Sequence, residues 1–217
     1  MLQSAVSRCA KLLWTLSIAG LNRQTHIVRY QMYRRIKEAT QGLDLSGKVL
    51  SVSLSEHLCH LIGIRTEQIT TANYPAFTLC SLNIESDSYD VVVSDQVLEH
   101  VHCNPQEAID EILRVLKPGG FAINTTCFLT PFHGEPVYGA EGAGDYWRFS
   151  CHGLRYLHRR YSRIIAADGW GNPFMGVVNA LGLTRMPVPD ETWHPLHKLA
   201  THNRDSYHYV VWIVAQK

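Results

Sequence analysis

The sequence predicts a three-layer α/β fold in which helices cover both faces of a mostly parallel sheet. Residues 89–93 form a short apolar run without alternation, which is typical of a strand buried on both faces. A helical pattern and a second apolar run, residues 121–126, follow within about forty residues, and strand, helix and strand in this order form a βαβ unit. With 217 residues and 46% hydrophobic content, the chain can bury one sizeable core.

The helix of this βαβ unit carries the clearest start signals in the chain. Asn104 offers an N-cap, Pro105 stands at the first helical position and Glu107 at the third. The expected buried stripe consists of Ile109, Ile112, Leu113 and Leu116. Residues 117–120, which include two glycines, are expected to end the helix.

The rest of the chain alternates in the same way. Before this unit we expect helices at 9–21 and 26–40, a strand at 48–53, a helix at 56–62 and a strand at 68–72. After it we expect a helix at 150–161, a strand at 163–167, a helix at 177–183 and a last strand at 207–215. The predicted division is therefore a helical N-terminal cap, residues 1–47, and an α/β domain, residues 48–217.

The charge is nearly balanced over the whole chain, but it is distributed unevenly along the sequence. The net charge of +1 gives no reason to expect a nucleic-acid partner. Residues 1–48 carry eight Lys and Arg against two acids, whereas the remainder has twelve against seventeen. This basic arm would suit an acidic surface, a phosphorylated substrate or an anionic membrane, although a solvated helical face is the favoured interpretation.

The N-terminal apolar run, residues 9–21, is too short to span a bilayer and contains Lys11. A signal peptide is one alternative for this segment. We favour an amphipathic helix that packs on the core or on a partner, so no stable membrane span is expected. A homodimer formed through the N-terminal helices is a further expectation.

The cysteines and histidines give no metal signature. Six cysteines without a CxxC pair predict reduced thiols in a cytoplasmic protein. Two groups bring histidine and cysteine close in sequence: His57, Cys59 and His60, and His100, His102 and Cys103. Neither has the paired spacing of a zinc finger, so no metal site is predicted.

Residues 88–126 and the segment that follows them have a known counterpart. That segment contains Cys127-Phe128, then His133 and Pro136, and then DYWRF at 145–149. From about Lys48 to the C-terminus the chain resembles class I S-adenosylmethionine-dependent methyltransferases, especially a subgroup with the pattern PF-x4-H-x2-P…DYWRF. Cys127 stands where that pattern has proline. The resemblance implies a Rossmann-like fold with a seven-stranded sheet, an antiparallel final strand, and S-adenosyl-L-methionine as cofactor.

The resemblance also assigns a cofactor site. It comprises Ser51, Ser53, Leu54, Asn73, Tyr74, Asp95, Gln96, Val97 and His100. Three of these positions depart from the family, because Ser51 replaces an acid, Ser53 a glycine and Asn73 the carboxylate that binds the ribose hydroxyls. A third family acid, near the adenine, is replaced by Thr78. We therefore expect binding to be retained but weakened.

His133 is the predicted catalytic residue, because an imidazole past the end of a central strand can take a proton from a hydroxyl or amine. The alternative is a histidine that holds the loop by a hydrogen bond. Asp145 would orient His133, Arg148 would hold an anionic group, and Tyr146 would form an apolar or sugar-stacking wall. The glycine-rich residues 137–144 would be either a flap over the acceptor or a surface insertion.

The predicted function is S-adenosylmethionine-dependent methylation of an oxygen or nitrogen atom of a small molecule, such as a sugar, a glycan precursor or a secondary metabolite. Two alternatives remain open. The chain could be a methyltransferase-like protein that has lost catalysis and serves as a partner or binding subunit. It could also use the cofactor pocket for other chemistry, such as a cyclisation.

Overall fold

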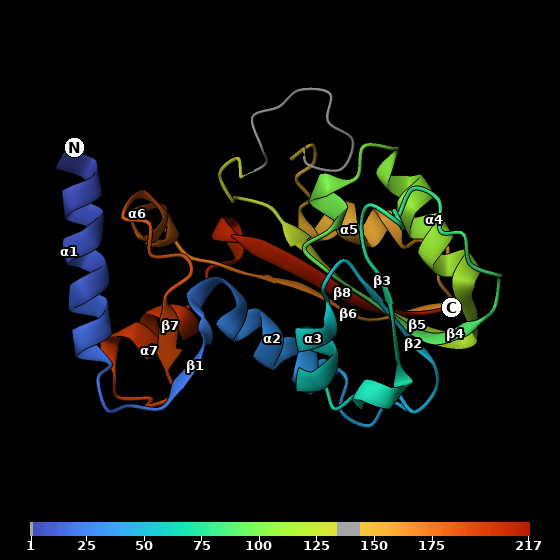
Figure 1. Cartoon of the computed structure of the whole chain (residues 1–217), viewed down its shortest axis with the longest axis horizontal. Coiled ribbons are helices and arrows are strands. Elements are labelled where there is room, and N and C mark those ends of the chain that lie inside the picture. The colour runs from blue at the N-terminus through green and yellow to red at the C-terminus, as the bar shows by residue number, and fades with distance from the viewer. Residues whose placement is uncertain (1, 134–143) are drawn as a thin grey trace. The chain divides into compact units, whose positions relative to one another are not determined.

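The computed structural model describes residues 2–133 and 144–217, which form two compact units (Figure 1). Unit 1 comprises residues 1–35 and 170–209, and unit 2 comprises residues 36–169 and 210–217. Unit 1 thus joins the N-terminal segment to a distant part of the sequence, which the predicted cap of residues 1–47 does not include. The predicted flap, residues 137–144, lies outside the described residues except for Gly144.

Unit 2 is built on a six-stranded sheet in the order β3-β2-β4-β5-β8-β6. Its strands are β2 (Val49–Val52), β3 (Ile69–Ala72), β4 (Tyr89–Asp95), β5 (Leu116–Cys127), β6 (Arg163–Trp170) and β8 (Val210–Gln216). The first four of these pair in parallel, and β8 is antiparallel to β5. The mostly parallel sheet with an antiparallel last strand is confirmed, with six strands where seven were expected.

Three helices complete the layers of unit 2: α3 (Glu56–Leu61), α4 (Pro105–Val115) and α5 (Cys151–Leu157). In Figure 1, α4 and α5 lie on one side of the sheet and α3 on the other. The central strands are therefore covered on both faces. Val91, Val92 and Val93 of β4 are completely buried, as their apolar run predicts.

Helix α4 begins as predicted and ends earlier. The Asn104 side chain accepts a hydrogen bond from the Gln106 N–H at 3.0 Å, which confirms the N-cap. The helix ends at Val115 because Leu116 already pairs with Tyr89 of β4. Leu116 is thus the first residue of a twelve-residue strand and not part of the helical stripe.

Unit 1 contains a small two-stranded sheet and helices. Its elements are α1 (Leu2–Ser17), β1 (Arg23–His26), the first part of α2 (Ile27–Ala39), α6 (Met175–Ala180), β7 (Pro187–Pro189) and α7 (Pro195–Thr201). The two predicted N-terminal helices are confirmed with shifted ends. The sequence did not predict β1, β7 or α7, because β1 and β7 are short and their antiparallel pairing joins Arg23 to Pro189 across the chain.

The prediction that all cysteines are reduced is wrong for one pair. Cys80 and Cys103 form a disulfide, with Cα atoms 5.7 Å apart. Their separation of 23 residues matches no redox or metal motif, so only the fold brings them together. No helix in residues 2–133 and 144–217 combines the length and apolar character needed to cross a membrane.

A fully buried histidine links the sheet to α5. The Nδ1–H of His158 donates to the Leu154 carbonyl at 2.8 Å, and its Nε2 accepts from the Asn124 amide at 2.7 Å. Burial lowers the pKa of His158 to about 4, because the charged ring would lose its hydration. The ring is therefore neutral in the folded protein.

We expect the free energy of unfolding to fall as the pH is lowered from about 6.5 to about 4. Between these pH values His158 is protonated in the unfolded chain but not in the folded chain. Its contribution of about 3 kcal/mol to the free energy of unfolding is therefore present above pH 6.5 and is lost as the pH approaches 4. Urea denaturation at several pH values measures this. His158→Gln should flatten the dependence, and an unchanged slope in that variant would contradict the assignment.

Candidate functional site

A cavity opens where the carboxyl ends of three parallel strands, β2, β3 and β4, meet. Its volume is about 270 Å³. It is lined by Ser53, Tyr74, Phe77, Thr78, Leu79, Cys80, Gln96, Val97, His100, Val101 and His102. This edge is the place where open α/β sheets bind their ligands.

The structure brings together five of the nine predicted cofactor residues. Ser53, Tyr74, Gln96, Val97 and His100 line the cavity, whereas Ser51, Leu54, Asn73 and Asp95 do not. Ser51 is completely buried within β2, and Leu54 is 77% exposed. Sequence reasoning missed the apolar wall after β3, although Phe77 and Leu79 follow the predicted Asn73 within a few residues.

The loop after β2 has the backbone conformation that a glycine-rich turn would adopt. Ser53 and Leu54 have φ angles of 51° and 64°, in the left-handed region. Asn73 supports this loop, because its Oδ1 accepts a hydrogen bond from the Leu54 N–H at 3.0 Å. The loss of glycine therefore left the turn in place, at a cost of about 1 to 3 kcal/mol for each strained residue.

The cavity lining contains no carboxylate. None of its lining residues, within the part of the chain that the structure describes, is an Asp or a Glu. Tyr74, Phe77 and Val97 supply apolar surface, while Thr78 and Gln96 supply hydroxyl and amide groups. An adenine base and a ribose suit such walls, since the base needs apolar contact and the hydroxyls need hydrogen-bond partners. The residues present thus fit the nucleoside part of S-adenosylmethionine, without the carboxylates that usually hold it.

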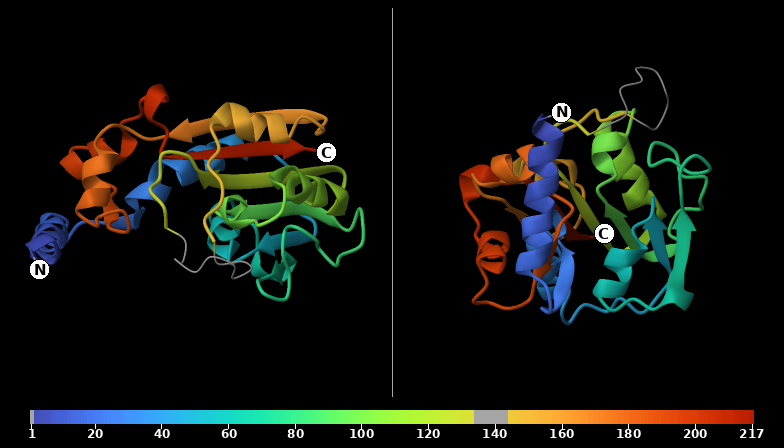
Figure 2. Two further views of the ribbon diagram at one scale, coloured as in Figure 1. Left: turned by 90° about the horizontal axis from the view of Figure 1, so that it is seen from above. Right: turned by 60° about the vertical axis from the view of Figure 1, so that its left-hand side comes forward.

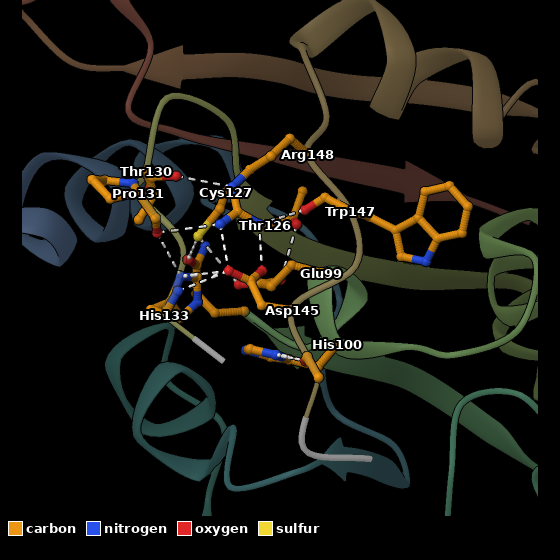
Figure 3. Close-up of polar contacts among 12 residues, drawn as sticks. Glu99, His100, Thr126, Cys127, Thr130, Pro131, His133, Asp145, Trp147 and Arg148 are labelled. Atoms are coloured by element: carbon orange, nitrogen blue, oxygen red, sulfur yellow. Dashed lines mark hydrogen bonds and ion pairs between the residues drawn. The ribbon is translucent and has the colours of Figure 1, made fainter. Parts of the chain in front are cut away.

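His133 and Asp145 lie together beyond the end of β5, as predicted (Figure 3). Asp145 Oδ2 accepts from the His133 backbone N–H at 2.9 Å and lies 3.3 Å from His133 Nδ1. The Asp145 side chain is completely buried. Burial disfavours its charge, but hydrogen bonds from Arg148 and from the His133 N–H outweigh this and lower the pKa of the Asp145 carboxyl.

Arg148 uses every N–H of its guanidinium group within the protein. Two of them hold both oxygens of Asp145. The other three donate to the carbonyls of Thr130, Pro131 and Trp147, at 2.9, 3.2 and 2.8 Å. An anionic acceptor would have to displace one of these partners. We therefore assign Arg148 to the loop and not, as predicted, to the substrate.

Glu99 ties the following segment to the sheet. Its buried carboxylate accepts from the Thr126 hydroxyl at 2.9 Å and from the Cys127 thiol at 3.3 Å. Its carbonyl accepts from the backbone N–H groups of Tyr146 and Trp147. Burial, with the nearby charge of Glu99, raises the pKa of the Cys127 thiol. Cys127 therefore serves as a neutral hydrogen-bond donor and not as a nucleophile.

Two imidazoles meet at this edge of the sheet. His100 Nδ1 lies 2.6 Å from the Gly144 carbonyl, and His133 Nδ1 lies 3.1 Å from the Pro131 carbonyl. A carbonyl can only accept, so both Nδ1 atoms donate, which leaves Nε2 as the acceptor atom of each ring in its neutral form. The rings contact edge to face, with centroids 5.2 Å apart.

These two histidines and Asp145 each place one potential metal-ligand atom within 4.8 Å of the others. The Asp145 oxygens already accept from Arg148 and from the His133 N–H. Because the carboxylate is engaged in this way, the contacts favour a role of the cluster in holding the loop.

Replacing Arg148 with lysine should lower the free energy of unfolding by about 2 kcal/mol. Lysine keeps the charge but cannot hold both Asp145 oxygens and three carbonyls at once. Urea denaturation compares Arg148→Lys with Arg155→Lys, a matched change at an exposed position of α5. Equal stability of the two variants would contradict the role assigned to Arg148.

Comparison with known proteins agrees with this geometry. A family described as a methyltransferase domain matches residues 34–124, which include β2, β3, β4, α4 and most of β5. No curated protein matches the chain in sequence.

Several solved structures share the fold. The S-adenosyl-L-methionine complex of Haemonchus contortus phosphoethanolamine N-methyltransferase 2 aligns with a TM-score of 0.55 at 12% identity, over 96% of this chain and 57% of that one. A chain from the complex of the Haloferax volcanii Trm112 methyltransferase activator with a methyltransferase aligns with a TM-score of 0.50 at 15% identity, over 87% and 91%. The [4+2]-cyclase SpnF aligns with a TM-score of 0.50 at 14% identity, over 99% and 94%.

At these identities the structures show the fold alone, and the domain match adds a methyltransferase domain over residues 34–124. S-adenosyl-L-methionine is the cofactor that this match supports, and the cavity lies at the carboxyl edge of the sheet, where open α/β folds bind their ligands. Residues 34–124 are thus a methyltransferase domain, on a fold that the chain shares with S-adenosylmethionine-dependent methyltransferases.

Proposed function

We propose that this methyltransferase acts on an oxygen or nitrogen atom of a small molecule, with His133 taking the proton that the acceptor loses. One observation carries the proposal. Nε2 of His133 has no partner among the described residues, and the His133 ring contacts His100, which lines the cavity. A general base has to come within hydrogen-bond reach of the proton that it takes, and an acceptor bound between the cavity and His133 would meet this condition.

In this proposal each residue of the site has its own role. Bound S-adenosylmethionine supplies an electrophilic methyl group on its sulfonium. Tyr74 and Phe77 pack against the nucleoside, and Gln96 offers it an amide. His133 accepts the proton at Nε2, and the carboxylate of Asp145, 3.3 Å from Nδ1, stabilises the imidazolium that forms.

The acceptor is proposed to be neutral and partly apolar. Arg148 has no free N–H for an anionic group, as its five donors are engaged. The segments on either side of His133 and Asp145 expose Leu129, Phe132 and Tyr146, which are 46%, 64% and 47% accessible. Such surfaces suit a sugar ring or an aromatic or aliphatic metabolite that bears a hydroxyl or an amine.

A second candidate is a methyltransferase-like binding subunit. It is favoured by the lack of any carboxylate among the described residues of the cavity lining, since neutral groups hold the ribose hydroxyls less strongly. A third use of the pocket, for chemistry such as cyclisation, agrees with the name of one structural neighbour, the [4+2]-cyclase SpnF.

The functions are separated by incubating the protein with S-adenosylmethionine and a panel of small alcohols, sugars and amines. Formation of S-adenosylhomocysteine together with a methylated acceptor supports the proposal. Cofactor binding with no turnover on any acceptor favours the second candidate. Conversion of an added compound without loss of the cofactor's methyl group favours the third.

Asn73→Asp should tighten cofactor binding by about tenfold. The carboxylate can still accept from the Leu54 N–H, and its second oxygen can accept from a ribose hydroxyl. Calorimetric titration with S-adenosylhomocysteine measures the change. Asn73→Ala serves as the opposite control, because it leaves the Leu54 N–H without its acceptor and should weaken binding. No gain for Asn73→Asp would mean that residue 73 does not face the ribose.

His133→Ala should lower turnover by about a hundredfold or more while cofactor affinity stays nearly unchanged, because a positioned base contributes about 10² to 10⁴ in rate. The readout is the rate of S-adenosylhomocysteine formation with a saturating acceptor. His102→Ala is the matched control. His102 lines the cofactor cavity, so its loss should change cofactor affinity more than turnover.

If His133 only holds the loop, its replacement should lower thermal stability and weaken both ligands together. Turnover of His133→Ala within a few-fold of the parent would reject the role as base.

A further inference from the structure

Helix α1 is fixed to unit 1 by one face only. Ser7 Oγ donates to the Leu181 carbonyl at 2.8 Å, and Trp14 Nε1 donates to the Pro187 carbonyl at 2.8 Å. The side chains of Trp14 and of Ile18, just beyond the helix, are buried. At 100° per residue, Ser7, Trp14 and Ile18 fall on the same side of the helix. Figure 2 shows α1, in dark blue, at the edge of its unit, with the other elements of unit 1 on one side of it.

The opposite face of α1 is an exposed apolar stripe. It consists of Val6, Cys9, Leu12, Leu13 and Leu16. These residues lie within an arc of about 120°. Val6 is 48% exposed, Leu12 59%, Leu13 67% and Leu16 61%. A continuous row of exposed leucines marks an interaction surface, whereas isolated ones do not.

Unit 1, which carries this stripe, has a positive net charge. Unit 1 has nine Lys and Arg against three Asp and Glu, while the rest of the chain has 11 against 16. Residues 1–37 include seven Lys and Arg and no acid, and exposed Arg8 flanks the stripe. Unit 1 therefore combines an apolar stripe with a charge of +6. This combination is complementary to a surface that has negative charge on the outside and apolar groups beneath it.

A second copy of the chain fits this stripe less well. The helix is about 24 Å long, so two such stripes would cover roughly 500 Å² in total, below the 1,200 Å² or more of stable interfaces. Two copies would also bring together two units that each carry a charge of +6, and α1 has no acid to balance its basic side chains. A phospholipid surface has neither problem, because its anionic headgroups pair with Arg8 and its acyl region receives the leucines.

We propose that unit 1 docks reversibly on anionic phospholipid membranes through the outer face of α1. The helix lies in the plane of the interface, in agreement with the lack of any membrane-spanning helix in the described residues. Val6, Leu12, Leu13 and Leu16 enter the headgroup boundary, and the basic side chains of unit 1 contact the lipid phosphates. This docking is independent of the proposed acceptor chemistry.

The test is sedimentation of the full chain with vesicles of phosphatidylcholine, with and without phosphatidylserine. We expect binding to the vesicles that contain phosphatidylserine, and binding at least about tenfold weaker without it or at high salt. Leu12→Gln/Leu16→Gln should lower vesicle binding by about tenfold or more without changing the charge. Thr15→Gln, an exposed change on α1 outside the stripe, should leave it within about twofold.

Three results would overturn the proposal: no binding to phosphatidylserine vesicles, equal binding by the double glutamine variant with its fold intact by circular dichroism, or equal loss in Thr15→Gln. Light scattering in the same buffers tests whether the stripe instead binds a second copy of the chain. A dimer that the double variant disperses, without vesicle binding, would assign the stripe to a second copy of the chain.

Discussion

The contact of Asp145 with Arg148 is the constraint on which the site depends. Asp145 holds Arg148 through both oxygens, and Arg148 holds the carbonyls of Thr130 and Pro131. The same Asp145 binds the His133 N–H. One buried carboxylate therefore fixes the loop after β5 to the segment before α5. Because this segment is also bonded to the Glu99 carbonyl, the position of His133 is set relative to β4 and β5 together.

Compared with the cofactor site that the family pattern implies, the cavity keeps some features and lacks others. The fold has kept the tight turn after β2, although Ser53 and Leu54 adopt left-handed angles that glycine would adopt without strain. It has also kept the apolar walls, with Tyr74 and Phe77 near the end of β3. Among the described residues, the lining has no carboxylate. If this cavity is the cofactor site, its polar contacts are weaker than the family pattern implies, and cofactor affinity is the property on which the proposed function depends.

The sequence predicted the elements whose signals are local. Asn104 and Pro105 begin α4, and the apolar run of β4 is buried as expected. It predicted the meeting of His133 and Asp145 from a family pattern, and the two side chains lie together. It did not predict β1 and β7, whose short strands exist through pairing across the chain.

Two further features could not be predicted from the spacing of residues in the sequence. The Cys80–Cys103 disulfide joins two loops of the cavity wall, and only the fold brings them together. Arg148 was expected to bind an anion because sequence shows the charge of a side chain but not which backbone carbonyls surround it. Asn73 was expected at the ribose, and the structure adds a contact that the sequence does not show, because its oxygen accepts from the Leu54 N–H.

The cavity at the carboxyl edge of β2, β3 and β4 is the proposed cofactor site, on which the proposed function depends. Amide hydrogen exchange with and without millimolar S-adenosylhomocysteine tests this assignment most directly, because protection maps the bound segment without knowledge of the acceptor. The account predicts slower exchange in residues 74–80 and 96–102, which line the cavity, and little change in α1. Unchanged exchange in both segments, or protection confined to unit 1, would contradict it.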